Sequence, residues 1–328
     1  MSCPSITRRG FLGAAAGLSF TWLVPARGED WPSRPVRIIV PFPPGQGADI
    51  TARIIGDKLA VALGQPVTID NRPGAGGTLG ADIAAKSPAD GYTLVMAGPA
   101  NMSIGPSLYP KLPYSPTNDF APVARMNTVP FVFVVNASSP IQNIKDLVVM
   151  AKAHPGEVTY GSSGNGSTSH LVQALFTEMA GIKATHVPYK GSAPNITDLL
   201  GGRTTFTAET AAAVMTYLQA GKLRGIGVSS IKRIPFLPDI PSLDEQGIKG
   251  YDAIAWAGLV APTGTPAAVL ERLNAEVIRI VASPEVQQRF GTLAMIPTTD
   301  TREQFAAFLK SDSRQWAIAV KSSGATAE

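Results

Sequence analysis

Glycine and small hydroxyl residues crowd one short stretch of the chain, YGSSGNGSTSH (160–170). Glycine lets a ligand approach backbone N–H groups closely, and a helix start offers unpaired N–H donors with about half a positive charge. A helical pattern begins at Thr168, so both features coincide here. Such a loop can hold a small anion without a cationic side chain, although each serine could equally serve as a helix cap. The candidate residues are Ser163, Gly164, Asn165, Gly166 and Ser167.

Two other uses of such a loop fit the sequence poorly. A nucleotide site calls for G-x-G-x-x-G or G-x-x-x-x-G-K-[ST], but GAGGTLG (74–80) has the wrong spacing and the second pattern does not occur. An acyl intermediate calls for G-x-S-x-G, which GSSG (161–164) does not match. His154, His170 and His186 have no partner at metal-ligand spacing, and His170 fits a cap or packing role. We therefore expect no enzyme activity, no metal and no cofactor.

Three further glycine-rich loops each follow a predicted strand and precede a predicted helix. They are PFPPGQGAD (41–49), NRPGAGGTLGA (71–81) and AGPANMS (97–103). The carboxyl ends of strands lie at one edge of a sheet, so the loops can converge on a ligand. The second of them fits a tight turn packed against the sheet equally well.

Three side chains near the same predicted edge could adjust what is bound. Tyr189 and Lys190 lie in PYKGSAPN (188–195), although a lysine there is more often a solvated charge than a ligand contact. Glu209 ends the run TTFTAE (204–209). An acid at that place would repel a second carboxylate but would suit an amine, a hydroxyl or a water; a merely structural role is the alternative.

The first 28 residues are typical of an export signal rather than of the folded protein. Arg8 and Arg9 precede Gly-Phe-Leu and a mildly apolar stretch that ends at Val24, a pattern that resembles a twin-arginine signal. The 15 residues from Gly10 to Val24 are short for a membrane span. We predict a periplasmic protein exported by the twin-arginine route, with an ordinary secretory signal as the alternative.

The charge balance changes when that signal is set aside. Three of the 28 Lys and Arg residues lie in it, which leaves 25 against 24 Asp and Glu. With this balance and no basic stripe, we expect no nucleic-acid partner. The one cysteine, Cys3, also lies in the signal. The mature protein is therefore expected to have no disulfide, no thiol nucleophile and no cysteine-bound metal.

Short apolar runs alternate with amphipathic helical patterns along the mature chain. Apolar residues recur at helical spacing from Asp49 to Leu63 and from Thr168 to Ala180, with Gly64 and Gly181 placed to end the two helices. The tail from residue 265 is also helical in pattern. We expect parallel sheets covered on both faces. The predicted strands span residues 36–42, 66–71, 92–98, 131–136, 158–163, 184–189, 204–209, 224–230 and 254–262.

The order of these elements predicts an α/β fold of two lobes. The chain has 328 residues, 45% of them hydrophobic, which is enough for a large core and more than one domain. The chain would enter a second lobe at residues 131–247 and return after a proline-rich stretch (233–247). The first lobe would then consist of residues 29–130 and 248–328. Two crossovers between such lobes create a cleft at the strand ends, where ligands bind.

Seven motifs occur in an order that resembles one family, the Bug-type periplasmic receptors of tripartite tricarboxylate transporters. The resemblance covers about residues 31–324 and implies a two-lobe Venus-flytrap architecture without catalysis. It also implies a small organic carboxylate as ligand, two membrane subunits as transport partners, and a monomeric receptor; docking on a signalling partner is the alternative role. The motifs are PFPPGQGAD, NRPGAGGTLGA, SPADGYTL, LYPKLPYSPTNDFAPVA, YGSSGNGSTSHL, VPYKGSAP and LQAGKLRGIGVSS.

The family's ligand contacts can be carried onto matching positions of this chain. The resemblance implies that loops of both lobes hold one carboxylate, often through ordered waters. Two positions depart from the family pattern: Gln46 replaces a second glycine, and Glu209 replaces the end of MFD or MFA, so the ligand of relatives cannot simply be transferred. The implied contacts are Phe42, Pro44, Gly45, Gln46, Gly47, Asp49, Gly98, Ala100 and Asn101 in the first lobe, and Ser163, Gly164, Asn165, Gly166, Ser167, Tyr189 and Glu209 in the second.

Overall fold

Strands and helices alternate along residues 31–326, which together with residues 1–2 are the part of the chain that the computed structural model describes. Residues 3–28 of the expected export signal, with Arg8 and Arg9, lie outside the described residues. Helix α1 ends at Gly64 (φ 67°) and α5 ends at Gly181 (φ 61°), as the sequence predicts. Both glycines adopt the left-handed conformation that other residues adopt only with strain.

The elements of the first 136 residues are β1 (Val36–Val40), α1 (Gly47–Leu63), β2 (Val67–Asn71), η1 (Ala75–Gly77), α2 (Thr78–Ala85), β3 (Thr93–Ala97), η2 (Pro99–Ile104), α3 (Gly105–Leu108) and β4 (Phe120–Asn136). The next are α4 (Ile144–Ala153), β5 (Thr159–Ser162), α5 (Thr168–Ala180), β6 (Thr185–Pro188), α6 (Ser192–Leu200), β7 (Phe206–Thr210), α7 (Ala211–Gln219) and β8 (Leu223–Val228). The last are β9 (Ile254–Pro262), α8 (Ala267–Val281), α9 (Pro284–Thr292), β10 (Ile296–Pro297) and α10 (Arg302–Ser323).

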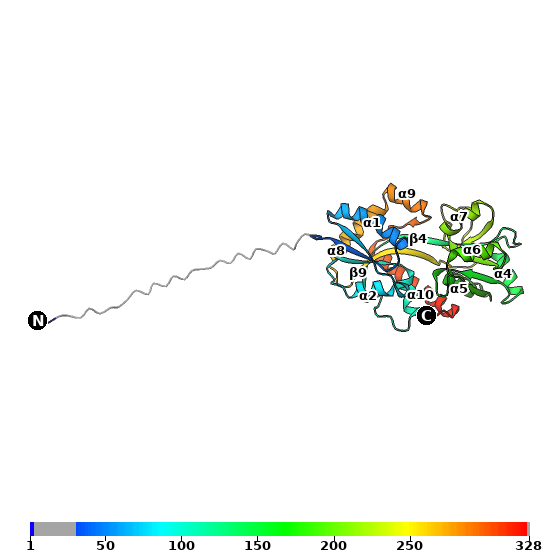
Figure 1. The fold of residues 1–328 in the computed structure, drawn as a ribbon, viewed down its shortest axis with the longest axis horizontal. Helices are drawn as coiled ribbons and strands as arrows, with labels where there is room; N and C mark the ends of the chain where they lie inside the picture. The colour runs from blue at the N-terminus through cyan, green and yellow to red at the C-terminus, as the bar shows by residue number, and fades with distance from the viewer. Residues whose placement is uncertain (3–30, 327–328) are drawn as a thin grey trace. The chain divides into compact units, whose positions relative to one another are not determined.

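The strands form a mixed sheet rather than the expected parallel ones. Its order is β2-β1-β3-β9-β4-β7-β5-β6, and β8 and β10 also pair with β4. The pairs of β1 with β2 and β3, and of β5 with β6 and β7, are parallel, as expected. The prediction is wrong in the middle, where β9 and β4 run antiparallel to their neighbours. Figure 1 shows β4 and β9 running between the two groups of helices.

Strand β4 is much longer than the predicted strand 131–136 because it serves both lobes. Its first half pairs with β9, and its second half pairs with β7 and β8. Pro122 and Pro130 lie in the first half, and a proline normally argues against a strand since it has no N–H to donate. The register against β9 shifts between Pro122 and Ala124, where the ladder accommodates the proline. The chain crosses back between Ser229 and Ile254, where Ala253 N donates to the carbonyl of Ser229.

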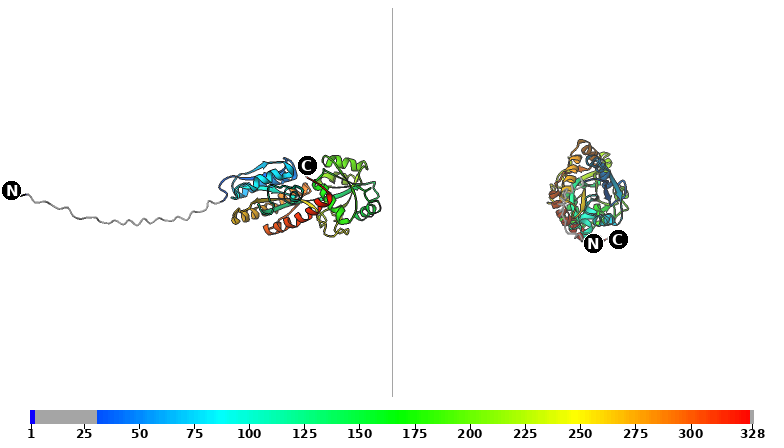
Figure 2. Two further views of the ribbon diagram at one scale, coloured as in Figure 1. Left: turned by 90° about the horizontal axis from the view of Figure 1, so that it is seen from below. Right: turned by 90° about the vertical axis from the view of Figure 1, so that its left-hand side faces the viewer.

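Two hydrophobic clusters lie in the two lobes, and helix α10 contributes to both. Phe305, near the start of α10, packs with Val95 and Trp256 in the first cluster. Trp316, near its end, packs in the second cluster, which includes Phe176. The left view of Figure 2 shows α10, in red, extending from one lobe to the other. Helix α10 is thus a third connection besides the two crossovers.

The middle of α10 is held by a buried carboxylate. Asp312 accepts hydrogen bonds from Ser103 Oγ (2.5 Å), Trp256 Nε1 (2.8 Å) and Trp316 Nε1 (2.9 Å). Burial raises its pKa to about 6. Because the two indoles belong to different clusters, this carboxylate ties the cores together at their junction.

Candidate functional site

All four glycine-rich loops reach one cleft between the lobes. Two adjoining cavities there have volumes of about 640 and 430 Å³. They share four lining residues from different elements: Gln46, Ala100, Thr168 and Thr210. The expected convergence at the strand ends is therefore present, and the 71–81 loop takes part through Gly76.

The second-lobe loop is a cradle built by the chain's own hydrogen bonds. Ser167 caps α5: its Oγ accepts from His170 N (3.2 Å) and donates to the carbonyl of Gly164 (2.7 Å). Ser163 N donates to Ser169 Oγ (2.9 Å). Gly164 and Gly166 take φ values of 138° and 69°, which favour glycine and allow the loop to fold back on the helix start.

This internal bonding changes which donors face a ligand. Gly166 N donates to His170 Nδ1 (3.1 Å) and Gly164 N to Ser162 Oγ (3.2 Å), so two of the three expected amides are already engaged. Thr168 and Ser169 are the first two residues of α5, and their N–H groups have no acceptor within the helix. Both line the larger cavity. Besides Asn165 N, the third expected amide, the donors available at the cradle are therefore those of the helix start, which the sequence indicated as a source of N–H donors without marking Thr168 and Ser169 as site residues.

Two stacked histidines support the cradle from behind. The rings of His170 and His186 lie parallel, with centroids 3.7 Å apart and an interplanar angle of 5°. Ser162 Oγ lies 2.6 Å from His186 Nε2. Burial lowers the pKa of each histidine to about 4, helped for His170 by the neighbouring His186. Ser162 is fully buried and lines neither cleft cavity, so this pair braces the loop, as expected for a packing role of His170.

A buried carboxylate holds the first-lobe loop 41–47, and Asn71 Nδ2 also donates to the carbonyl of Phe42 (3.1 Å). Asp49 is 2% exposed and accepts from Gly45 N (2.9 Å), from Asn71 Nδ2 (2.9 Å) and twice from Arg53. The hydrogen bonds from Arg53 lead the effects that hold its pKa at about 2. Asp49 thus fixes the loop from inside, while Phe42, Gln46 and Gly47 line the smaller cavity.

The third loop is also held by one of its own side chains. Asn101 is fully buried; its Oδ1 accepts from Gly98 N (2.9 Å) and its Nδ2 donates to the carbonyl of Met96 (3.1 Å). Its own carbonyl accepts from Tyr114 Oη (2.6 Å). Gly98 and Ala100 are therefore presented to the cleft, while Asn101 itself holds the turn.

The three residues expected at the distal edge take different places. Tyr189 donates its hydroxyl to Asp198 Oδ2 (2.9 Å) and lines neither cavity, and Lys190 is exposed outside both. Glu209 lines the larger cavity and is only 2% exposed. Its carboxylate accepts from Ser192 Oγ (2.7 Å) and Asn195 Nδ2 (2.8 Å). Burial raises its pKa.

The structure brings most of the predicted site residues to the two cavities. Those that line them are Phe42, Gln46, Gly47, Gly98, Ala100, Ser163, Gly164, Asn165, Gly166, Ser167 and Glu209. Pro44, Gly45, Asp49, Asn101 and Tyr189 do not line either cavity. Several other residues also line the cavities, of which Thr168, Ser192 and Thr210 were not predicted although they lie at helix starts and so carried a sequence signal. Asn127 and Trp256, within strands, carried none.

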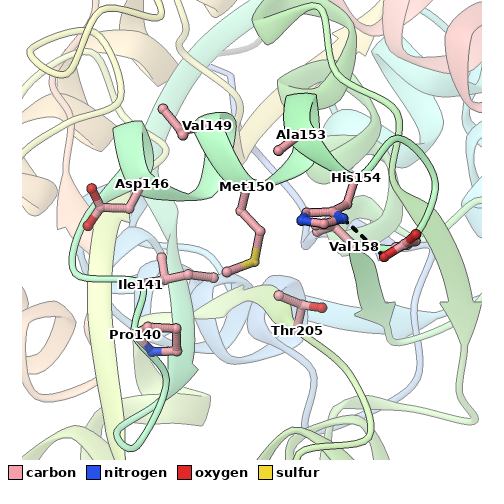
Figure 3. Close-up of a pocket in the computed structure, with 10 residues that line it drawn as sticks. Pro140, Ile141, Asp146, Val149, Met150, Ala153, His154, Val158 and Thr205 are labelled. Atoms are coloured by element: carbon pink, nitrogen blue, oxygen red, sulfur yellow. Dashed lines mark ion pairs between the residues drawn. The ribbon is translucent and has the colours of Figure 1, made fainter.

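A separate hollow of about 560 Å³ lies against α4, away from the four loops (Figure 3). It is lined largely by apolar side chains such as Ile141 and Met150. Its polar residues include Asp146 and Glu157, and His154 Nδ1 lies 3.4 Å from a carboxylate oxygen of Glu157. Two acids make this hollow unfavourable for an anion, so the cleft remains the candidate site.

The described residues offer neither a metal site nor a membrane-spanning helix. Among residues 1–2 and 31–326, no three His, Cys, Asp or Glu residues are grouped so that they could bind a metal ion. Within the same residues, no helix has the length and apolar character needed to cross a bilayer.

The chain is similar to one family of known proteins. The family model described as "Tripartite tricarboxylate transporter family receptor" matches residues 51–324. BugT of Bordetella pertussis is 36% identical over 317 residues, covering 96% of each chain. The solved structure of R. palustris Rpa4515 with adipate is 35% identical, covers 90% of this chain and 99% of its own, and has a TM-score of 0.74.

A second solved structure, MatC from Rhodopseudomonas palustris with bound malate, is 30% identical and has a TM-score of 0.70. It covers 88% of this chain and 99% of its own. These neighbours have the two-lobe architecture of periplasmic binding proteins, and the expected α/β fold class is thereby confirmed.

Proposed function

The chain belongs to the tripartite tricarboxylate transporter receptor family, and from that premise we propose that it captures a small organic carboxylate in the cleft between its lobes. The expectation that the protein is not an enzyme is confirmed, because members of this family are substrate-binding receptors. Adipate and malate, which two solved neighbours contain, support the proposed ligand class.

One observation carries the proposal. Loops from both lobes meet at a cleft in which the helix start of α5 presents the free N–H groups of Thr168 and Ser169, with serine hydroxyls beside them. The described residues that line the two cavities include no lysine, arginine or histidine. Helix N-termini bind carboxylates through such donors and through the helix dipole. Bridging waters would complete the contacts from the first-lobe loops.

The capture step follows from the way the lobes are joined. We assign residues 29–130 and 248–328 to the first lobe and 131–247 to the second, with the end of α10 packed into the core of the second lobe. The ligand binds to the α5 cradle first, and Gln46 and Ala100 then close over it by a hinge motion. Three or four charge-assisted hydrogen bonds, each worth roughly 1.5–3 kcal/mol, suffice for a micromolar dissociation constant after ordering costs.

The wider role follows from the signal and the family. A twin-arginine signal at residues 1–28 would deliver the receptor, already folded, to the periplasm. There the loaded monomer would dock on two membrane subunits of a tripartite transporter and release its ligand to them.

The test removes one backbone donor and leaves the helix intact. Thr168 is the first helical residue of α5, where proline is well tolerated, and Ser167 has an extended conformation (φ −65°, ψ 157°) compatible with a following proline. Thr168→Pro deletes the N–H, whereas Thr168→Ala deletes only the side chain. Calorimetric titration with adipate, malate, succinate, glutarate and benzoate identifies binders of the wild-type protein.

We expect Thr168→Pro to raise the dissociation constant of each binder by about ten-fold or more, since a charge-assisted hydrogen bond is lost. Thr168→Ala should have a smaller effect, and both variants should keep the wild-type melting temperature. Equal affinity of Thr168→Pro and Thr168→Ala would show that the α5 amides do not hold the ligand.

A further inference from the structure

Glu209 is a buried carboxylate that faces the cleft without a cationic partner. Within the described residues, its recorded partners are Ser192 Oγ and Asn195 Nδ2, both neutral. By contrast, the buried Asp49 is paired with Arg53 inside its own loop. An ionised carboxylate buried with neutral donors alone is unfavourable unless a further positive group reaches it. Because Glu209 lines the larger cavity, that group can come from a ligand.

A second buried acceptor belongs to a residue that lines the adjoining cavity. Asn127 is 1% exposed, and its Oδ1 has no hydrogen-bond partner. The orientation of its amide is fixed, because Nδ2 donates to Thr51 Oγ1 (2.9 Å) while the Thr51 hydroxyl is directed at Met295 Sδ (3.8 Å). Asn127 lines the smaller cavity. The cleft thus holds two buried acceptors that need donors, in addition to the amides that suit an anion.

The anion cradle and Glu209 lie at the carboxyl ends of two neighbouring strands, β5 and β7. Strands β5 and β7 are parallel, with Gly161 opposite Thr207. Glu209 lies two residues beyond Thr207 in β7, and Ser163, two residues beyond Gly161, directly follows the end of β5, so their backbones are separated by about one strand spacing, roughly 4.8 Å. Ser163 N donates to Ser169 Oγ (2.9 Å), which places the start of α5 beside this strand end. A donor on the ligand therefore reaches Glu209 only if it lies close to the ligand carboxylate.

We propose that the ligand is a carboxylate that also carries a protonated amine, with the carboxylate at the start of α5 and the ammonium group against Glu209. This inference rests on the proposed carboxylate-binding function. The short distance between the start of α5 and Glu209 favours α- and β-amino acids over amino acids with a longer chain between the carboxylate and the amine. A plain dicarboxylate would bring a second negative charge toward Glu209, which is unfavourable in a site with no cation.

The experiment compares ligands that differ in one substituent. Two matched sets serve as probes: alanine, lactate and propionate, and their larger counterparts phenylalanine, phenyllactate and phenylpropionate. β-Alanine and 4-aminobutyrate test the spacing, and succinate and adipate test a second carboxylate. Glu209→Gln keeps the size and polarity of the side chain but removes its charge. Glu157→Gln, an exposed acid outside the cleft, is the control.

We expect the wild-type protein to bind the amino member of at least one set about ten-fold or more tighter than the hydroxy and unsubstituted members. In Glu209→Gln this preference should fall about ten-fold, with little change for the unsubstituted acid. Glu157→Gln should keep the wild-type ranking.

Three results would overturn the inference: an unchanged ranking in Glu209→Gln, no binding of any amino member, or tightest binding of succinate or adipate. Titrations in buffers of different ionisation enthalpy add a further measure. If the protein takes up one proton when a dicarboxylate binds, Glu209 is protonated in the complex. That result would contradict the assignment of an ammonium group to Glu209. Failure of Thr168→Pro to weaken any ligand would instead contradict the proposed function itself, so the two outcomes are distinguishable.

Discussion

The two loops that face each other across the cleft are built differently. The second-lobe loop 163–167 is tied to buried groups behind it, through Ser162, Ser169 and His170. The first-lobe loop is tied through two neighbouring residues: Gly45 N donates to Asp49, and Asn71 Nδ2 donates to the carbonyl of Phe42 (3.1 Å). Its residues 43–47 are exposed.

This difference assigns different tasks to the two lobes. A loop whose donors are already oriented loses little entropy when a ligand arrives, which favours affinity. An exposed loop with fewer ties can adjust to ligands of different size. In the proposed capture step, the second lobe would thus provide the fixed part of the site and the first lobe an adaptable cover.

The strongest way to break this comparison is to remove the carboxylate that holds the first-lobe loop. Asp49→Ala leaves Arg53, Asn71 and Gly45 N without their shared acceptor, and we expect a loss of about 3 kcal/mol in the free energy of unfolding, measured in urea. Asp49→Asn, which keeps an acceptor, should lose less. If both variants unfold like the wild-type protein, the loop does not depend on this carboxylate.

Acid should act on the second-lobe loop through its histidines. An unfolded histidine has a pKa near 6.5, whereas those of His170 and His186 lie at about 4. As the pH falls below 6.5, the histidines are protonated in the unfolded state but stay neutral in the folded state. Their contribution to the free energy of unfolding is therefore fully present above pH 6.5 and is lost between pH 6.5 and 4. We expect a loss on the order of 2 kcal/mol per histidine by pH 5.

The measurement is the free energy of unfolding against pH. His170→Asn, which keeps an acceptor for Gly166 N but does not titrate, should flatten this dependence. His154→Asn changes an exposed histidine and serves as the control. Equal slopes for the wild-type protein and His170→Asn would contradict the bracing role of His170.

The smallest expected changes in the free energy of unfolding come from replacing one glycine in each loop. Gly45 (φ 83°) and Gly166 (φ 69°) both have positive φ, and a Cβ at either position meets nothing closer than 3.6 Å. Gly166→Ala should lower the free energy of unfolding by about 1 kcal/mol, since the braced loop cannot relax the strain. Gly45→Ala should lower it by about half as much. The helical Gly291→Ala should instead raise it slightly. A larger loss at Gly45 than at Gly166 would reverse the comparison.

Much of the fold could be predicted because its signals are local. Apolar runs, helical spacing and the glycines at 64 and 181 depend on neighbouring residues only. The first half of β4 could not be predicted, since Pro122 and Pro130 argue against a strand and only pairing with the distant β9 compensates. The antiparallel direction of β4 and β9 likewise depends on where the chain crosses between lobes.

The candidate site was predictable in place but not in detail. Glycine content and strand ends marked the loops, because both can be read along the chain. Whether a polar side chain in such a loop faces inward or toward the ligand depends on its tertiary partners. Asp49 meets Asn71 and Tyr189 meets Asp198, pairings that no local pattern marks. Glu209, whose place at a strand end was visible, does line the cleft.

Helix α10 affects how the two lobes unfold on heating. Phe305 and Trp316 belong to one rigid helix but to two hydrophobic clusters, and Asp312 bonds indoles from both. If one cluster unfolds, it exposes apolar side chains of α10 and so weakens the packing of the other cluster. The two lobes are therefore expected to lose their structure in a single cooperative transition, even though the proposed capture step moves them relative to one another.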